Sequence, residues 1–210
     1  MATKTSTADA AIHLERLERR VYTFEIEGVT PLIVNRWSEK AREMMLQAQQ
    51  TKTRAKKSPK DPVANFEASK YKLKDGSDAF PATAFKAAIV HAGRLFDGIT
   101  QVSLKQTVLV LGDGSDARGD ELVKLSFDDC IKREDTPRNA SGVADLRYRA
   151  QYNGWGAKLR VQVIEGIIDP GSLAALVDAA GIGGVGEWRP TAPKSATGTY
   201  GTFMLKGFDE

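Results

Sequence analysis

Two periodicities divide the chain into segments that are expected to form strands and helices. Residues 22–26 alternate between apolar and polar side chains, which is typical of a strand with one buried face. Gly28 interrupts this pattern before it resumes over 29–34, so we expect a bulge or bend there. Apolar residues recur at helical spacing over 85–96, and Pro81 stands where that helix is expected to begin.

Further segments follow the same two patterns. Residues 38–48 carry apolar side chains on one side of an expected helix, and 11–20 have a weaker helical character. Asp169 is placed to cap a second long helix, with Pro170 in its first turn and Gly181 as its terminating residue. The remaining strands are expected at 102–111, 122–127, 130–133, 147–151, 157–163 and 200–208.

The order of these elements predicts the fold class. Without insertions it is βαββαβ, the order of a ferredoxin-like fold. We therefore expect a modified ferredoxin-like α+β fold: an antiparallel sheet with helices on one face and long insertions, in a single domain over 1–210. Residues 1–10 are expected to be a disordered tail and 50–79 a mobile basic loop, with an inserted segment at 112–156.

Composition and charge narrow the functional classes only slightly. The chain has 210 residues, and 30 Lys and Arg against 27 Asp and Glu give a net charge of +3. This bias alone indicates no partner. The single cysteine, Cys130, excludes an internal disulfide framework and a cysteine-based zinc cluster. No apolar run has the length of a membrane span and the start has no signal-peptide core, so we expect no membrane partner and a cytoplasmic location.

The glycine-rich loop after the second long helix is the strongest functional signal. Its glycines are Gly181, Gly183, Gly184 and Gly186. Such a loop suits the close approach of a polyanion, and Trp188 beside Arg189 offers base stacking together with phosphate pairing. A helix stop followed by a flexible connection explains the glycines equally well. The spacing Gly181-x-Gly183-x-x-Gly186 matches the dinucleotide fingerprint, but a dinucleotide site is rejected because the motif follows a helix rather than a strand.

Basic residues interleave with aromatic ones along the strands at 147–151 and 157–163. This is the composition of a groove that follows a single strand, although a solvated sheet face has the same pattern. Phosphates are expected at Lys86, Arg147, Arg149, Lys158, Arg160 and Arg189, with Lys194 as a further binding residue. Bases are expected to stack on Trp155, Trp188 or Tyr200.

No catalytic residue, metal site or cofactor is predicted. The two histidines, His13 and His91, have no metal-binding spacing, and the acidic residues of 113–121 do not follow a calcium-loop pattern. There is also no phosphate-binding Gly-Lys-Ser/Thr element and no nucleophile elbow.

Two segments carry a resemblance to a known family. Phe80-Pro81-Ala82-Thr83-Ala84-Phe85-Lys86-Ala87-Ala88 opens the first long helix, and a glycine-rich stretch over 181–201 separates the last helix from the last strand. Both resemble motifs of the RAMP superfamily, ferredoxin-like proteins that include backbone and processing subunits of CRISPR effector complexes. The resemblance implies that 112–156 is a thumb-like insertion that wedges into guide RNA. Residues 30–37 also look like small phage-encoded proteins of unassigned function.

The resulting prediction is a non-enzymatic single-stranded nucleic-acid-binding protein that oligomerises along the strand. It is CRISPR-backbone-like or phage-encoded, in the latter case working in the cytoplasm of a bacterial host. RNA and DNA both stay open, because no residue is tied to a 2′-hydroxyl contact. One alternative is a protein-binding assembly factor or inhibitor module. Another is an RNA-processing ribonuclease with His91 or His13 as general base.

Overall fold

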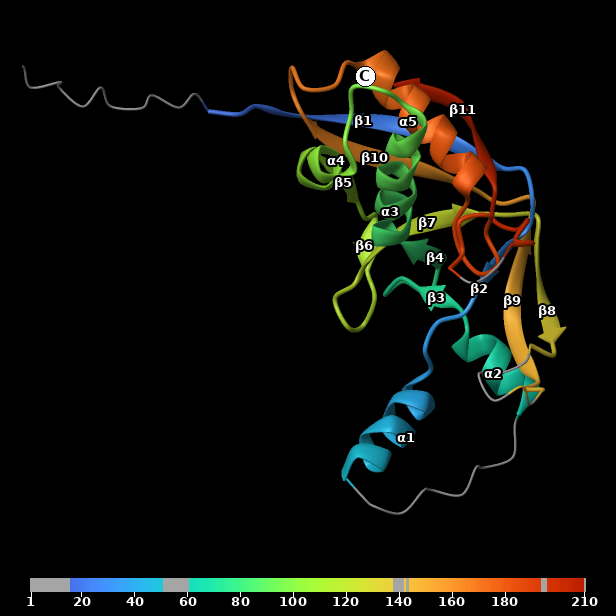
Figure 1. Cartoon of the computed structure of the whole chain (residues 1–210). Helices are drawn as coiled ribbons and strands as arrows, with labels where there is room; N and C mark the ends of the chain where they lie inside the picture. The colour runs from blue at the N-terminus through green and yellow to red at the C-terminus, as the bar shows by residue number, and fades with distance from the viewer. Residues whose placement is uncertain (1–15, 51–60, 138–141, 143, 194–195, 210) are drawn as a thin grey trace, which may run out of the picture.

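The computed structural model of the protein describes residues 16–50, 61–137, 142, 144–193 and 196–209 (Figure 1). The helices are α1 (Glu39–Gln50), α2 (Pro62–Ala68), α3 (Ala82–Ala92), the single 3-10 turn η1 (Gly93–Leu95), α4 (Gln101–Thr107) and α5 (Pro170–Gly183). The strands are β1 (Arg19–Gly28), β2 (Leu32–Val34), β3 (Tyr71–Lys72), β4 (Asp78–Pro81), β5 (Val108–Leu111), β6 (Gly114–Ser115), β7 (Glu121–Ser126), β8 (Asp129–Asp135), β9 (Arg147–Asn153), β10 (Gly156–Ile164) and β11 (Phe203–Asp209).

The main sheet has the ferredoxin-like arrangement. Its order is β11-β1-β10-β7-β4-β3, with β5 also paired to β10, and all of these pairs are antiparallel. Within the βαββαβ unit, β1 is the first strand, β5 continued by β7 the second, β10 the third and β11 the fourth. Their spatial order is fourth, first, third, second. The predicted fold class, a modified ferredoxin-like α+β fold, is confirmed.

Helices α3 and α5 pack against each other and cover one face of this sheet (Figure 1). Alternate side chains of the strands point toward them, because successive residues of a strand face opposite sides. The buried residues that meet in this layer include Phe24, Ile26, Phe85, Ile89, Leu159, Val161, Leu173 and Val177. Each such side chain stabilises the fold by about 1.5–3 kcal/mol relative to exposure. The other face of β1 and β10 carries exposed residues, among them Glu25 and Lys158.

A second sheet, β2-β9-β8, lies beside the first and contains the β8–β9 hairpin of the long insertion (Figure 1). The chain passes from the first sheet to the second at Gly28, as the interrupted strand pattern predicts. A Cβ atom at Gly28 would overlap the indole of Trp155. The same indole donates a hydrogen bond of 2.8 Å from Nε1 to the carbonyl of Thr30. A single buried tryptophan therefore fixes the bend.

Three segments differ from the sequence prediction. The strand expected over 102–111 is helix α4 followed by β5, because the Thr100 hydroxyl caps the helix by accepting from the Ser103 N–H at 3.1 Å. The loop expected over 50–79 contains α2, β3 and the start of β4 in its described part, and Asp61 caps α2. Residues 16–20, expected as part of a helix, are irregular until β1 begins.

The ends of the last two elements are also shifted. Helix α5 continues past Gly181 to Gly183 and ends at Gly184, whose φ of 67° belongs to the left-handed region that glycine tolerates. The last strand begins at Phe203 rather than residue 200. The tail predicted over 1–10, the expected helix at 11–15 and the basic stretch at 51–60 lie outside the described residues.

Candidate functional site

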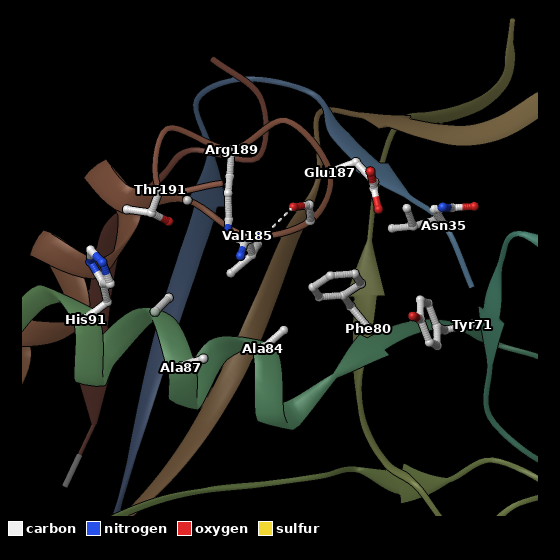
Figure 2. Close-up of a pocket in the computed structure, with 14 residues that line it drawn as sticks. Asn35, Tyr71, Phe80, Ala84, Ala87, His91, Val185, Glu187, Arg189 and Thr191 are labelled. Carbon is white, nitrogen blue, oxygen red and sulfur yellow. Dashed lines mark hydrogen bonds between the residues drawn. The ribbon is translucent and has the colours of Figure 1, made fainter. Parts of the chain in front are cut away.

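A cavity of about 300 Å³ lies between α3 and the loop that follows α5. Figure 2 shows α3 as one wall and the loop as the opposite wall. Phe80, Ala84, Ala87 and Val185 give the cavity an apolar lining. Its polar lining consists of Asn35, Tyr71, His91, Glu187, Arg189 and Thr191. An apolar hollow with a few converging polar groups is the usual form of a ligand site.

Two further hollows adjoin the cavity along α3 and share His91 with it. Lys86 and Lys105 line one of them, and Arg94 lines the other. No residue that lines either hollow is acidic. We call the cavity and these two hollows together the α3 groove. It collects basic side chains from α3, η1, α4 and the loop after α5, so it forms a predominantly positive concave surface in which Glu187 is the acidic residue of the lining.

The glycines of the loop allow its backbone to lie in close contact with the backbone of neighbouring segments. Gly186 has a φ of 80°, and a Cβ atom there would lie 2.6 Å from the carbonyl oxygen of Ile33. The N–H of Glu187 donates to that carbonyl at 2.9 Å, while the N–H of Val185 donates to Gly201 at 2.9 Å. These N–H groups are therefore engaged and do not form a cradle for phosphates. Gly181, Gly183 and Gly184 also pack tightly, which favours the structural interpretation of the glycines.

Behind the loop, arginines of the β8–β9 hairpin pack on the loop's aromatic rings. The Arg133 guanidinium lies 5.2 Å from the ring centre of Trp188 and 4.9 Å from that of Tyr200. Arg149 lies 4.9 Å from the Trp188 ring. We call Arg133, Arg149, Trp188 and Tyr200 the arginine–aromatic cluster. Its rings contact the protein's own cations, which occupy part of the surface that base stacking would need.

Arg149 is the buried member of this cluster, with a side chain only 2% exposed. It forms ion pairs with Asp135 at 3.7 Å and Glu187 at 3.6 Å. Burial lowers the pKa of its guanidinium, against the effect of the two carboxylates. Arg133 also contacts Asp135, by a hydrogen bond of 2.8 Å. Arg149 thus fixes the hairpin to the loop and does not reach solvent, contrary to its predicted role at a phosphate.

Sequence reasoning missed Arg133, which lies directly opposite Arg149 across the β8–β9 hairpin. Its basic side chain in a strand-like segment was the only available signal. The pairing register that places it beside Arg149, and the fold that brings Trp188 over both, are not visible in local sequence. The same holds for Asn35 and Tyr71, which reach the cavity from segments remote from α3.

Of the predicted basic and aromatic site residues that the structure describes, Lys86 and Arg189 line the α3 groove, and of the predicted loop glycines Gly183, Gly184 and Gly186 do. Trp155 is 1% exposed and lies in the core, so its prediction as a base-stacking residue is wrong. Lys158 and Arg160 are exposed on the sheet face opposite α3 and α5, remote from the groove. They follow the pattern of a solvated face, because Lys158 is opposite Glu25 and Arg160 is 3.7 Å from Asp113.

The other predicted binding residues lie near the hairpin or are not described. Arg147, the first residue of β9, forms an ion pair of 3.0 Å with Asp145. Lys194 lies outside the described residues, as does His13. Among the residues that the structure describes, no group of three or more His, Cys, Asp or Glu side chains could hold a metal ion. No described helix is long and apolar enough to cross a membrane.

Comparisons with known proteins give similarity of structure and none of sequence. No family model matches the chain, and no curated protein matches it. A chain of the "Cryo-EM structure of the Type III-B Cmr-beta bound to cognate target RNA" aligns with a TM-score of 0.49 and 11% identity over 91% of this chain and 60% of its own length. This chain therefore spans less than two thirds of that neighbour. The "Crystal structure of Cmr6 from Pyrococcus furiosus" aligns with a TM-score of 0.40 and 10% identity over 90% of this chain and 100% of that one. Both neighbours come from structures of Cmr proteins.

Proposed function

We propose that the chain is a non-enzymatic protein that binds single-stranded nucleic acid in the α3 groove and oligomerises along the strand. The observation that carries this proposal is the convergence of Lys86, Arg94, Lys105 and Arg189 along one concave surface. Only Glu187, at the far end of the cavity, adds a negative charge to its lining. Cations in a groove gain counterion-release free energy when they replace the ions around phosphates.

The shape of the groove favours a single strand over a duplex. Its cavity is closed on two sides by α3 and the loop, so a flexible strand with unstacked bases enters more readily than a rigid helix. The apolar lining offers contacts to base faces, while the cations lie where the backbone would run. The arginine–aromatic cluster supports the loop from behind, and its role in this proposal is to keep the groove in shape.

The test is salt-dependent binding of single-stranded RNA and DNA, measured by fluorescence anisotropy. A triple variant, Lys86→Ala, Arg94→Ala and Lys105→Ala, is expected to weaken binding and to reduce the slope of log affinity against log salt by about 2. The matched control removes three cations from outside the groove, Lys158→Ala, Arg160→Ala and Lys206→Ala. If both triple variants lose the same affinity, binding depends on overall charge and the groove assignment fails.

Oligomerisation along the strand is tested separately by light scattering with oligonucleotides of increasing length. The mass of the complex is expected to rise in steps of one chain as the oligonucleotide lengthens. A complex that stays at one chain per oligonucleotide at every length would contradict this part of the proposal.

The non-enzymatic part of the proposal concerns His91, the histidine of the groove. Its imidazole makes no hydrogen bond in the described part of the chain, so no neighbouring group holds it as a general base is usually held. We expect labelled RNA to remain intact on prolonged incubation. Cleavage that disappears in the His91→Ala variant would instead make this chain a ribonuclease.

A protein-binding role is the second candidate, and α1 favours it. Trp37, just before the helix, is 59% exposed, and Met45 and Leu46 are 46% and 53% exposed. In Figure 1 α1 lies apart from both sheets. Exposed apolar side chains on a separate helix are typical of a surface that a protein partner covers. A defined complex formed without nucleic acid, and lost in Met45→Ser with Leu46→Ser, would establish this role.

A further inference from the structure

The cavity between α3 and the loop has two chemically different ends (Figure 2). Asn35, Tyr71 and Glu187 lie at one end, beside the ring of Phe80. His91, Arg189 and Thr191 lie toward the other end, where the cavity joins the rest of the α3 groove. The second end carries the positive charge. The first end has an acceptor, an amide and a hydroxyl around an aromatic surface.

Of the three polar groups at the first end, the fold uses the Glu187 carboxylate but not the other two. Within the described residues, neither the Asn35 amide nor the Tyr71 hydroxyl makes a hydrogen bond. The Glu187 carboxylate has one charged contact, an ion pair of 3.6 Å from Oε2 to Arg149, and its side chain is 37% exposed. Partly buried polar groups normally have hydrogen-bond partners, so this end of the cavity is suited to a polar ligand that supplies them.

The position of Glu187 is strongly constrained. Its N–H donates to the Ile33 carbonyl at 2.9 Å, and the buried Arg149 holds the carboxylate from behind. Gly186, with its φ of 80°, sets the turn that aims the side chain into the cavity. Burial raises the pKa of Tyr71, and the negative charge of Glu187 acts in the same direction, so the hydroxyl stays protonated. A fixed carboxylate beside neutral donors gives a defined pattern for hydrogen bonding.

We propose that this end of the cavity binds one guanine base of the bound strand, an inference that rests on the proposed function. The two oxygens of a carboxylate accept from two adjacent N–H groups, and guanine carries such a pair at N1 and N2. The Asn35 amide is placed to donate to an acceptor such as O6. Phe80 and Tyr71, whose rings meet edge to face at 5.7 Å, supply aromatic contact.

The other bases fit this end less well. Adenine and cytosine each turn a ring nitrogen acceptor toward the carboxylate, and two acceptors repel. Uracil offers a single N–H between two carbonyl oxygens, so the carboxylate would face at least one of them. The cavity volume of about 300 Å³ is at the lower end of the range of small-molecule sites, which suits one base rather than a larger cofactor.

The second end of the cavity explains how the strand would leave the base site. Arg189 donates from Nη1 to the Gly186 carbonyl at 2.8 Å, which orients its guanidinium along the cavity wall. Its other N–H groups make no hydrogen bond among the described residues and can meet a phosphate. Lys86 and Arg94 line the two neighbouring hollows, each of which shares His91 with the cavity. One base is thereby held while the neighbouring backbone follows the groove.

The first measurement is titration of the full chain with GMP, AMP, CMP and UMP, in which ligand-observed NMR detects binding. GMP is expected to bind about 10- to 100-fold more tightly than the others. Asn35→Ala, whose amide supports nothing in the fold, is expected to weaken this preference without changing the thermal midpoint. Glu187→Gln is expected to abolish it, with circular dichroism and the thermal midpoint to show that the variant is folded. Lys158→Ala is the control that leaves the preference unchanged.

The second measurement separates this inference from the function on which it rests. Uridine oligonucleotides that contain a single G, A or C are compared in the salt-dependent binding assay. Equal affinity for all of them, with GMP no better than AMP, would refute the guanine site while strand binding stands. GMP selectivity without binding to any oligonucleotide would instead overturn the proposed function and leave a site for a free guanine nucleotide.

Discussion

The substitution Trp155→Phe tests most directly whether Trp155 stacks on bases, as the sequence predicts, or stabilises the core, as the structure indicates. Sequence patterns place Trp155 among base-stacking residues, whereas the structure buries it, 1% exposed, with its indole against Gly28 and 6.0 Å from the ring of Phe203. Phenylalanine at this position keeps an aromatic ring but loses the N–H that donates to the Thr30 carbonyl at 2.8 Å. It also loses the volume of the second ring, beside a glycine that has no side chain to fill the space.

The expected magnitude follows from these two losses. An unmade hydrogen bond in a partly buried site costs about 1 kcal/mol. The lost apolar contact adds about 1–2 kcal/mol, since a fully buried side chain is worth about 1.5–3 kcal/mol and part of it remains. The variant should therefore lose about 2–3 kcal/mol of the free energy of unfolding. With a urea m-value of about 2 kcal/mol/M, the midpoint falls by about 1 M or slightly more.

Urea unfolding followed by circular dichroism measures this change. The matched control is Trp37→Phe, because Trp37 is 59% exposed and the same substitution there should stay within about 0.5 kcal/mol. Strand affinity of the folded Trp155→Phe protein should equal that of the wild type. Unchanged stability together with a loss of strand affinity would refute the reasoning and make Trp155 a binding residue.

Three further predictions concern the supports of the site. Gly201→Ala, at a φ of 67° and against the Val185 carbonyl, should lower the thermal midpoint more than Gly76→Ala, which has open space around it; equal shifts would contradict the packing argument. Asp116 is buried and pairs with Arg36 at 2.8 Å; burial acts to raise its pKa, but backbone N–H bonds and Arg36 lower it overall. Asp116→Asn should therefore destabilise the protein at pH 7, and urea unfolding should show the difference shrinking as the pH falls below 3.8, since stability tied to a lowered pKa is lost on protonation. Burial raises the pKa of Cys130, so alkylation of its thiol at pH 8 should be faster in urea than in the folded protein.

The order of elements was largely predictable because each element carries its own pattern. The alternation over 22–26, the helical spacing after Pro81 and the Asp169 cap are all local features, and all three are found in the structure. Helix α4 was missed because its residues also fit a strand pattern, and the Thr100 cap that decides between the two is a single side chain. Local propensity is weak where both patterns fit, so a cap or a tertiary contact determines the outcome.

The candidate site was predicted only in part. The sequence singled out Lys86 and Arg189, which the structure places in the α3 groove, and it also singled out Lys158 and Arg160, which lie on the opposite sheet face. Alternation along a strand shows that there are two faces, but not which face a ligand would meet. Tryptophan beside arginine likewise indicates a binding site in the sequence, but the same pattern occurs when the ring contacts the protein itself. The Trp188 ring contacts the protein's own guanidinium groups.

The sequence by itself determined the βαββαβ order, the apolar faces of the strands and helices, and the glycine-rich loop after the last helix. These depend on residues within one or two turns of each other, where backbone geometry links neighbouring side chains. Only the tertiary structure decided that Asn35, Tyr71 and Glu187 meet at one end of a cavity, and that Arg149 is buried behind it. Such convergence depends on strand register and on the packing of segments far apart in the chain, which no local pattern records.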